Sequence, residues 1–388
     1  MLKSSLFGRR VHIAGSISSE ETIGSTNDVK QAREMIELLV KELLRKGATF
    51  VIPVDAEKFR STDNQPICFD WLIWETLYTN LHLRPTNSPS PLVIAVQHHK
   101  NEEQIPAQFI NMWDTLRISD LINIDNVSHW NMNCKRMEAQ ARWGDILIAL
   151  GGAEGVLFLA NLYHDAGKPV IPLNLKLTSE YTGARHIFKF GLIRNNTQRL
   201  FHVEGDTDST TWINKINFKS RHNANTQVQI IINLLESLER PKAFAVRLLN
   251  TEHEHFIDVQ NFFDTVVQPV IEDELGYKLV VIDGKQPFEY ARIDQEIFAK
   301  LHRSSIVIAD ITGWRPNCFI ELGYALGRGL PTLILGKDGT DHPFDINSLS
   351  GHRWKTSGTV EDRRRTFRDH WNAVKSRPPL VQMEPLIP

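Results

Sequence analysis

Apolar residues recur along the chain with two different spacings, and this pattern predicts the elements of the fold. Short runs rich in Val and Ile predict buried strands, and longer segments with apolar residues three and four apart predict amphipathic helices. In the first half, strands are expected at residues 11–14, 49–54, 91–96, 120–124, 145–150 and 169–173, with helices between them. Strands that alternate with helices indicate a parallel sheet covered on both faces.

The alternation stops at about residue 176 and begins again after residue 240. The intervening segment is polar and rich in turn residues, with one predicted helix at 226–238. Later strands are expected at 243–249, 278–282, 305–309 and 331–335. We therefore predict an α/β fold class with two Rossmann-like or flavodoxin-like units and mainly parallel sheets. The predicted parts are a first domain at 1–175, a linker with a connecting helix at 176–240 and a second domain at 241–388.

The composition is that of an ordinary globular protein and points to no macromolecular partner. Hydrophobic residues make up 41% of the 388 residues, and 44 Lys and Arg nearly balance 46 Asp and Glu. Such a balance gives no overall field that would attract nucleic acid or a membrane surface. No window approaches the roughly 18 uncharged apolar residues of a membrane span. The three cysteines lie far apart, and neither they nor the 15 histidines have metal-ligand spacing. We expect a cytoplasmic protein that holds no metal and binds no nucleic acid or membrane.

Two turns of the first domain have the composition of a nucleotide-binding loop. Open α/β sheets bind ligands where strands end, because turns and helix N-termini present backbone N–H groups there. Gly15 and Ser16 follow the first strand, and a double glycine at Gly151 and Gly152 follows the strand at 145–150. The double glycine predicts a phosphate-binding loop, although no Lys-Ser/Thr follows it as in a Walker loop. A plain serine-capped turn is the alternative for the first of the two.

The second of these turns lies in a segment that resembles the SLOG superfamily. The run from Arg136 through Asp145-Ile-Leu-Ile-Ala-Leu-Gly-Gly-Ala-Glu-Gly155, followed by Gly167-Lys-Pro-Val-Ile-Pro-Leu173, carries the resemblance. That superfamily includes the LOG nucleotide phosphoribohydrolases, in which an arginine precedes the strand aspartate by nine residues, and sensor domains attached to sirtuin-like and TIR effectors. LOG enzymes also carry a glutamate in the next helix, where this chain has the apolar residues 156–159.

The resemblance extends over residues 11–173 and implies a Rossmann-like domain that binds a nucleotide-like ligand without hydrolysing it. Sensor domains of this kind bind cyclic or linear ADP-ribose species. The residues expected to contact the ligand are Gly15, Ser16, Arg136, Gly151, Gly152, Glu154 and Gly155.

The second domain carries two carboxylates suited to glycosidic chemistry. Asp310 ends a buried strand, where a carboxylate is costly unless it contacts a ligand or a helix N-terminus. Glu321 lies one helical turn after Asn317. One carboxylate can stabilise an oxocarbenium-like centre or act as nucleophile while the other orients a hydroxyl. The alternative is that Asp310 only caps the following turn and that Glu321 is an exposed helical residue.

The segment Ala309-Asp-Ile-Thr-Gly…Pro-Asn…Glu-Leu-Gly-Tyr-Ala325 resembles the nucleoside 2-deoxyribosyltransferases and their deoxyribohydrolase and TIR-like relatives. The resemblance covers residues 243–337, and the catalytic glutamate of that family matches Glu321. We expect Glu321 and Asp310 to be catalytic. An arginine at the end of a buried strand can contact a phosphate or pair with Asp310. The expected substrate-binding residues are Arg247, Asn317, Thr312 and Asp294, of which Asp294 can equally be solvated.

These patterns together favour a ligand-gated N-glycosidase. The second domain would cleave the base–ribose bond of NAD or another nucleotide after a nucleotide or ADP-ribose-type second messenger binds the first domain. By resemblance, such pairs of domains belong to bacterial antiphage defence, so we expect a homo-oligomer. NAD or a nucleotide enters as substrate, and we expect no cofactor. The alternatives are a nucleoside 2-deoxyribosyltransferase or nucleotide phosphoribohydrolase of nucleotide metabolism, and a non-catalytic nucleotide sensor.

Overall fold

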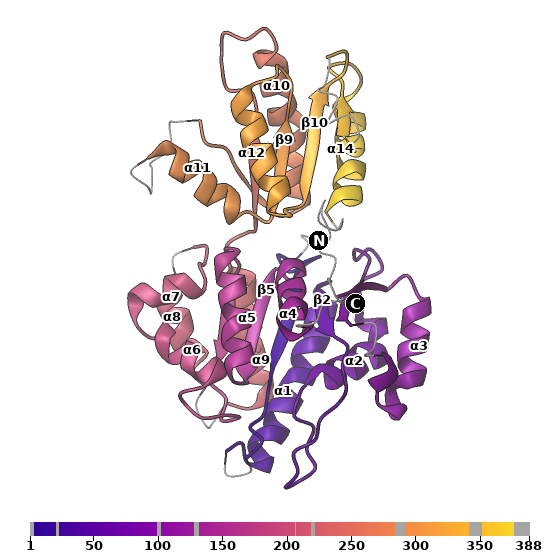
Figure 1. Cartoon of the computed structure of the whole chain (residues 1–388), viewed down its shortest axis with the longest axis vertical. Helices are drawn as coiled ribbons and strands as arrows, with labels where there is room; N and C mark the ends of the chain where they lie inside the picture. The colour runs from indigo at the N-terminus through magenta and orange to yellow at the C-terminus, as the bar shows by residue number, and fades with distance from the viewer. Residues whose placement is uncertain are drawn as a thin grey trace. The chain divides into compact units, whose positions relative to one another are not determined.

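The computed structural model confirms the predicted fold class. It describes residues 4–20, 23–98, 102–127, 132–205, 207–218, 222–283, 292–340 and 351–375. The chain divides into two compact units, the first ending at Glu239 and the second beginning at Arg240 (Figure 1). Each unit is built on a parallel sheet, which over the described residues has six strands in the first unit and five in the second.

The first sheet has the strand order β4-β3-β2-β1-β5-β6, and every neighbouring pair is parallel. The order reverses at β1, so the topological switch point lies between β1 and β5. In the register of this pair, Gly15 is opposite Leu150 and Ser16 is opposite Gly151. The strands are β1 (Arg10–Ser16), β2 (Thr49–Pro53), β3 (Val93–Gln97), β4 (Ile122–Asn126), β5 (Ile146–Gly151) and β6 (Val170–Leu173).

Helices follow the strands of the first sheet as the hydrophobic pattern predicts. The longest is α1, where the side chain of Ser25 accepts a hydrogen bond from the backbone N–H of Asp28 and caps the helix. Its buried residues recur three and four apart, which is the spacing of one helical face. The helices up to β6 are α1 (Thr26–Arg45), α2 (Asp70–Thr79), α3 (Ile110–Ile118), α4 (Met132–Trp143) and α5 (Glu154–Asp165), with short 3-10 turns at Leu81–Leu83, Glu102–Gln104 and Ala107–Phe109.

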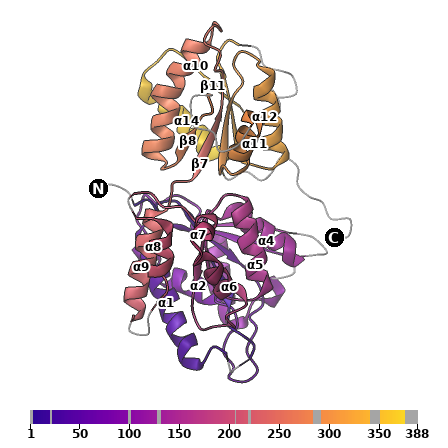
Figure 2. The same cartoon turned by 90° about the vertical axis from the view of Figure 1, so that its left-hand side faces the viewer.

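The segment 176–240, which we expected to link the domains, instead packs on the first unit, and its described residues form four helices. Their apolar residues, including Ile213, Ile231 and Leu234, are fully buried and belong to the core of the first sheet. Figure 2 shows α9 beside α1. The sequence pattern predicted only one of these helices, because the other three are short and are separated by polar turns. The helices are α6 (Gly183–Gly191), α7 (Arg194–Leu200), α8 (Ser209–Lys215) and α9 (Ala224–Ser237).

The second sheet has the order β11-β10-β9-β7-β8, with all pairs parallel. Its switch point lies between β7 and β9, which is the flavodoxin-like arrangement. The strand β11 was not among the strands predicted from the sequence, because its four residues give too short a pattern. The strands are β7 (Lys242–Val246), β8 (Lys278–Val280), β9 (Ile306–Asp310), β10 (Thr332–Lys337) and β11 (Gly351–Trp354).

Helices cover both faces of the second sheet. The long helical run after β7 begins as α10 (Phe256–Phe262) and contains two π-helical segments, Phe263–Val267 and Val270–Glu274. It packs against α14, and their contact includes Phe262 and Phe367. The α-helices of this unit are α10 (Phe256–Phe262), α11 (Ile293–His302), α12 (Pro316–Gly327) and α14 (Val360–Val374).

Candidate functional site

The predicted glycine turns meet at the switch point of the first sheet, where backbone atoms pack closely. A Cβ atom on Gly15 would lie 1.6 Å from the carbonyl oxygen of Leu150. A Cβ on Gly183, the first residue of α6, would lie 2.1 Å from the carbonyl oxygen of Gly152. Gly152 has a φ of +71° and Gly183 a φ of +51°, in the left-handed region that favours glycine. These positions therefore require glycine for packing, whether or not a ligand binds.

The chain itself takes up several of the N–H groups that could hold a phosphate there. The N–H of Gly152 donates to the carbonyl of Ser16 at 2.8 Å, that of Ile17 to Ile67, and that of Ser18 to Leu177. Glu154 and Gly155, in contrast, are exposed at the N-terminus of α5. The N-terminus of α5 is thus the part of the predicted loop that is open to an anionic ligand.

Arg136 of α4 lies beside a carboxylate group that the sequence analysis did not identify. Its Nη1 atom is 2.6 Å from Oδ2 of Asp55, which follows β2. Asp70 begins α2, and burial raises the pKa of its carboxyl to about 7, although Arg136 lowers it. A bridge between Ser16 and Cys68 places the start of α2 beside the end of β1. Asp55 follows a predicted strand directly, so its position was a signal that could have been read.

The spacing of Arg136 and Asp145, which carries part of the SLOG resemblance, does not correspond to a contact. Asp145 immediately precedes β5 and its Oδ1 accepts a hydrogen bond from Nη2 of Arg10 at 3.1 Å. Burial is the largest single influence on the pKa of Asp145 and acts to raise it. Nearby cations, with Arg10 contributing most, together lower it by more, so that the pKa lies below its usual range. Asp145 therefore fixes the amino end of the β1–β5 pair, at the opposite edge from the glycine turns.

Asp310 is fully buried at the end of β9, and both of its oxygens accept hydrogen bonds. Oδ1 accepts from the backbone N–H of Thr312 at 2.9 Å, and Oδ2 accepts from Nε1 of Trp354 at 2.7 Å. Burial raises the pKa of Asp310 to about 6, while these two bonds and Arg247 lower it. The hydroxyl of Thr312 accepts from the N–H of Lys337, at 2.9 Å. Asp310 and Thr312 thus hold the turn between β9 and α12 against β10 and β11.

Glu321 lies half-buried on α12, one turn after the exposed Asn317. Within the described ranges it makes no hydrogen bond or ion pair. Burial raises the pKa of its carboxyl to about 7, and Arg315 lowers it. Both Glu321 and Asp310 raise the pKa of the buried Cys318 thiol, after burial itself, so both carboxylates lie near Cys318. The structure therefore brings the two predicted carboxylates to the same end of the sheet.

Arg247 follows β7, on the other side of the switch point from Asp310. Its guanidinium lies over the ring of Phe263, with 5.1 Å from the Cζ atom to the ring centroid. Its Nε and Nη1 atoms are buried and have no hydrogen-bond partner in the described part of the chain. Burial lowers the pKa of Arg247, whereas Asp264, Asp283 and Asp310 raise it. A guanidinium among three carboxylates is better placed to balance their charge or to donate to hydroxyls than to attract phosphate.

Asp294 does not join this group through any contact that the structure shows. It forms a bidentate ion pair with Arg292, with Oδ2 at 2.5 Å from Nη2, and about half of its side chain is exposed. The hydrogen bonds from Arg292 hold the pKa of Asp294 below its usual range. These properties are those of a solvated carboxylate, which was the alternative stated for it.

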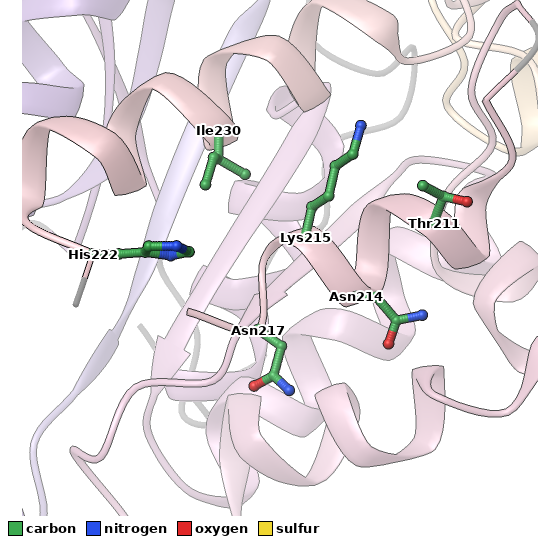
Figure 3. A pocket seen from close by; sticks show the side chains of 6 residues that line it. All are labelled: Thr211, Asn214, Lys215, Asn217, His222 and Ile230. Atoms are coloured by element: carbon green, nitrogen blue, oxygen red, sulfur yellow. The ribbon is translucent and has the colours of Figure 1, made fainter. Parts of the chain in front are cut away.

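The residues that the structure describes contain no group of three or more His, Cys, Asp or Glu side chains placed to hold a metal. Over the same residues, no helix is long and apolar enough to cross a membrane. A separate pocket of about 470 Å³ lies by α8 and α9 (Figure 3). The pocket has no carboxylate in its lining and so offers no group for glycosidic chemistry. The residues that line it are Thr211, Asn214, Lys215, Asn217, His222 and Ile230.

The sequence of the first unit decides the family. Residues 6–235 match the family model described as "ATP nucleosidase Cap17-like, N-terminal", which covers more than half of the chain. The chain belongs to this Cap17-like family. No curated protein matches the sequence.

The Cap17-like region begins just before β1 and ends inside α9, so it coincides with the first unit rather than with the predicted domain 1–175. The family description names a nucleosidase, a class of enzyme that cleaves the bond between a base and its sugar. Membership in the family therefore supports an enzyme that cleaves the base–sugar bond of nucleotides. The second unit, with Glu321 and Asp310, lies outside the matched residues.

Proposed function

We propose that the protein is a ligand-gated N-glycosidase whose second unit hydrolyses the base–ribose bond of a nucleotide. The observation that carries the proposal is Glu321, a half-buried carboxylate that makes no bond within the described ranges and lies by a turn anchored by Asp310. The Cap17-like family adds support, because its description names an ATP nucleosidase. ATP and NAD are the first substrates to test.

The proposed reaction breaks the bond between C1′ of ribose and the base nitrogen. The bonding electrons leave with the base, the oxygen of a water molecule binds C1′, and a water proton passes to the base. Ionised Glu321 stabilises the positive charge at C1′ or attacks it directly. Because its pKa is about 7, about half of the molecules carry the ionised form at neutral pH. Asp310 acts as a positioning residue, since both of its oxygens are bonded within the protein.

The proposed gate lies in the first unit. A nucleotide or ADP-ribose-type second messenger would place a phosphate at the exposed N-terminus of α5 and compete with Asp55 for Arg136. Such a ligand activates the enzyme only if it binds the active arrangement more tightly than the inactive one. We further propose that the active arrangement is a homo-oligomer and that the enzyme depletes a nucleotide pool in antiphage defence.

The test is to incubate the purified full chain with ATP, NAD or nucleosides and to follow released base by chromatography. Each substrate is tested alone and with a panel of cyclic nucleotides and ADP-ribose derivatives. We expect Glu321→Gln to reduce base release by about 10²–10⁴-fold. Glu254→Gln changes an exposed carboxylate of the same unit and serves as the matched control. Arg136→Gln should raise the activator concentration needed for half-maximal activity.

Turnover that persists in Glu321→Gln would contradict the assignment of the catalytic residue. Turnover that requires a free base as acceptor would identify a transferase instead of a hydrolase. Full activity without any member of the activator panel would remove the gate from the proposal and leave the hydrolase.

A further inference from the structure

The two loops that follow β7 and β9 meet at the switch point of the second sheet. His253 lies in the loop between β7 and α10, and Gly313 lies in the turn between β9 and α12. A Cβ atom on Gly313 would lie 2.8 Å from both Nε2 and Cε1 of the His253 ring. Gly313 also has a φ of +81°, in the left-handed region that favours glycine. Glycine at this position therefore allows the imidazole to pack directly against the turn.

This contact lies where an open α/β sheet binds its ligand. The binding crevice of such sheets is at the switch point, beyond the carboxyl ends of the strands. The turn that His253 contacts is anchored by Asp310, which accepts a hydrogen bond from the N–H of Thr312. The same turn leads into α12, which carries Glu321. An imidazole from the β7 side of the switch point thus rests on the turn that connects Asp310 with the helix of Glu321.

One hydrogen bond fixes which nitrogen of His253 carries the proton. The backbone N–H of His255 donates to Nδ1 of His253 at 3.2 Å. Nδ1 accepts this bond only when it carries no proton, so the ring proton is on Nε2. The side chain is partly exposed, and its Nε2 donates to no other residue in the described part of the chain. His253 therefore presents a neutral and oriented N–H donor beside the turn.

A donor of this kind matches a charge that develops during the proposed reaction. When the bond from ribose to a neutral base breaks, the electron pair leaves with the base, and the negative charge spreads over the ring nitrogens of the base. An N–H group aimed at such a nitrogen stabilises the transition state, as the donors of an oxyanion hole do for a developing oxyanion. A neutral imidazole can act in this way because it donates a hydrogen bond without first taking up a proton.

We infer that His253 is a catalytic residue whose Nε2–H donates a hydrogen bond to the departing base. This inference rests on the proposed function, because it concerns the reaction in which Glu321 acts at C1′. His253 keeps its own proton throughout, and the proton that the base finally keeps comes from water, so the balance of atoms is unchanged. His253 adds to the site residues predicted from the sequence.

The test compares two substrates that differ in the charge of the leaving base, in the base-release assay with the full chain and any activator that the wild type needs. The base of ATP departs with negative charge, whereas the base of N7-methyl-ATP is already cationic and departs neutral. His253→Ala should lower kcat for ATP by about 10²–10³-fold, which is the usual effect of removing one donor to a developing charge. The same variant should cleave N7-methyl-ATP at nearly the wild-type rate. His253→Gln carries an N–H donor and should recover part of the rate with ATP.

His255→Ala is the matched control, because it removes the neighbouring imidazole but keeps the backbone N–H that orients His253. It should cleave both substrates as the wild type does. An unchanged kcat for ATP in His253→Ala overturns the inference. An equal loss with both substrates also overturns it, because the ring would then be serving the turn. So does a wild type that cleaves NAD or N7-methyl-ATP but not ATP, because no group would then be stabilising a departing anion.

Glu321→Gln separates the two proposals, since positive charge develops at C1′ with either substrate. Base release that persists in that variant rejects the proposed function. Loss of base release in Glu321→Gln, together with an unchanged His253→Ala, rejects only the hydrogen bond from His253.

Discussion

The two units have comparable switch points in their sheets, but different groups occupy them. In the first unit the switch point between β1 and β5 is filled by backbone, where Gly15, Gly152 and Gly183 let three segments approach closely. In the second unit the switch point between β7 and β9 is bordered by the side chains of Arg247 and Asp310. The comparison shows that a glycine-rich turn can serve packing as well as ligand binding. Side chains that lack partners are the better guide to chemistry.

The same comparison separates ligand-binding groups from structural ones within each edge. In the first unit, the exposed N-terminus of α5 and Arg136 lie outside the packed glycines, and Arg136 is paired with Asp55. In the second unit, Asp310 is bonded through both oxygens and Glu321 is not bonded to any described residue. A carboxylate that is already fully bonded holds the site together, and one that is not remains available to a substrate.

The largest effect on stability is expected from Gly183→Ala. The new Cβ would lie 2.1 Å from the carbonyl oxygen of Gly152 and 2.2 Å from that of Gly151, so backbone has to move. We expect the first unit to lose more than about 4 kcal/mol or to fail to fold. Gly205→Ala is the matched control, because Gly205 also has a positive φ, +93°, but a Cβ there meets nothing within 4 Å.

The control should cost about 1 kcal/mol, which is the cost of the backbone conformation alone. Scanning calorimetry of the full chain measures both variants and shows whether the second unit keeps its own transition. Equal losses in the two variants would show that strain, and not the close approach of the three segments, makes glycine necessary.

An intermediate effect is expected from Trp354→Phe in the second unit. Phenylalanine can keep the stacking on Phe262, whose ring centroid is 4.5 Å from that of Trp354, but it removes the donor to Asp310. A buried carboxylate oxygen without its donor costs about 2–3 kcal/mol. Because this bond favours the ionised carboxylate, its loss should raise the pKa of Asp310 above about 6.

Urea unfolding at pH 5 and pH 8 measures this effect. The loss in Trp354→Phe should be larger at pH 8, where Asp310 is ionised, than at pH 5, where it is mostly protonated. Trp371→Phe changes another fully buried tryptophan of the unit and should show no such dependence on pH. A loss in Trp354→Phe that is the same at both pH values would mean that the ring, and not the hydrogen bond, carries the stability.

The sequence predicted the fold to the extent that hydrophobic periodicity determines it. Parallel strands buried on both faces form continuous apolar runs, and the strands from β1 to β10 follow such runs closely. The helices α6, α7 and α8 were not expected, because helices of seven to nine residues leave too short a periodic signal. The same limit applies to β11, whose four residues include Trp354, the partner of Asp310.

The candidate site was predictable only in part, because contacts between distant segments leave no local pattern. Asp310 and Glu321 could be placed at one strand end from sequence alone, but the bond from Trp354 that makes Asp310 structural joins residues 44 positions apart. Asp70 gave no signal, since its pKa depends on burial and on neighbours from other elements. The positive φ of Trp314, +52°, is likewise a backbone property that residue identity does not reveal.

The smallest effect on stability is expected from a feature that the two units share, which is a carboxyl group with a pKa of about 7. Burial raises the pKa of Asp70 in the first unit and of Glu321 in the second, so the folded protein holds each proton to a higher pH than the unfolded chain does. The stability from each group is complete below pH 4 and is lost as the pH rises through 7. Asp70→Asn and Glu321→Gln cannot ionise and should each gain on the order of 1–2 kcal/mol over wild type at pH 8, after allowance for solvent screening.

At pH 4, the difference between each of these variants and the wild type should be close to zero. Glu180→Gln is the control of opposite sign, because hydrogen bonds and ion pairs with Lys189 and Arg185 lower the pKa of Glu180. That variant should gain nothing at pH 8 and should instead be slightly less stable. Thermal unfolding between pH 4 and pH 8 measures all three variants.

If Glu321→Gln gains stability at pH 8 and loses base release, the ionised carboxylate is kept at a cost to the fold, which is expected of a group retained for function. A Glu321→Gln protein with wild-type stability at pH 8 would show that this carboxylate is well solvated, and its reactivity would then need another source.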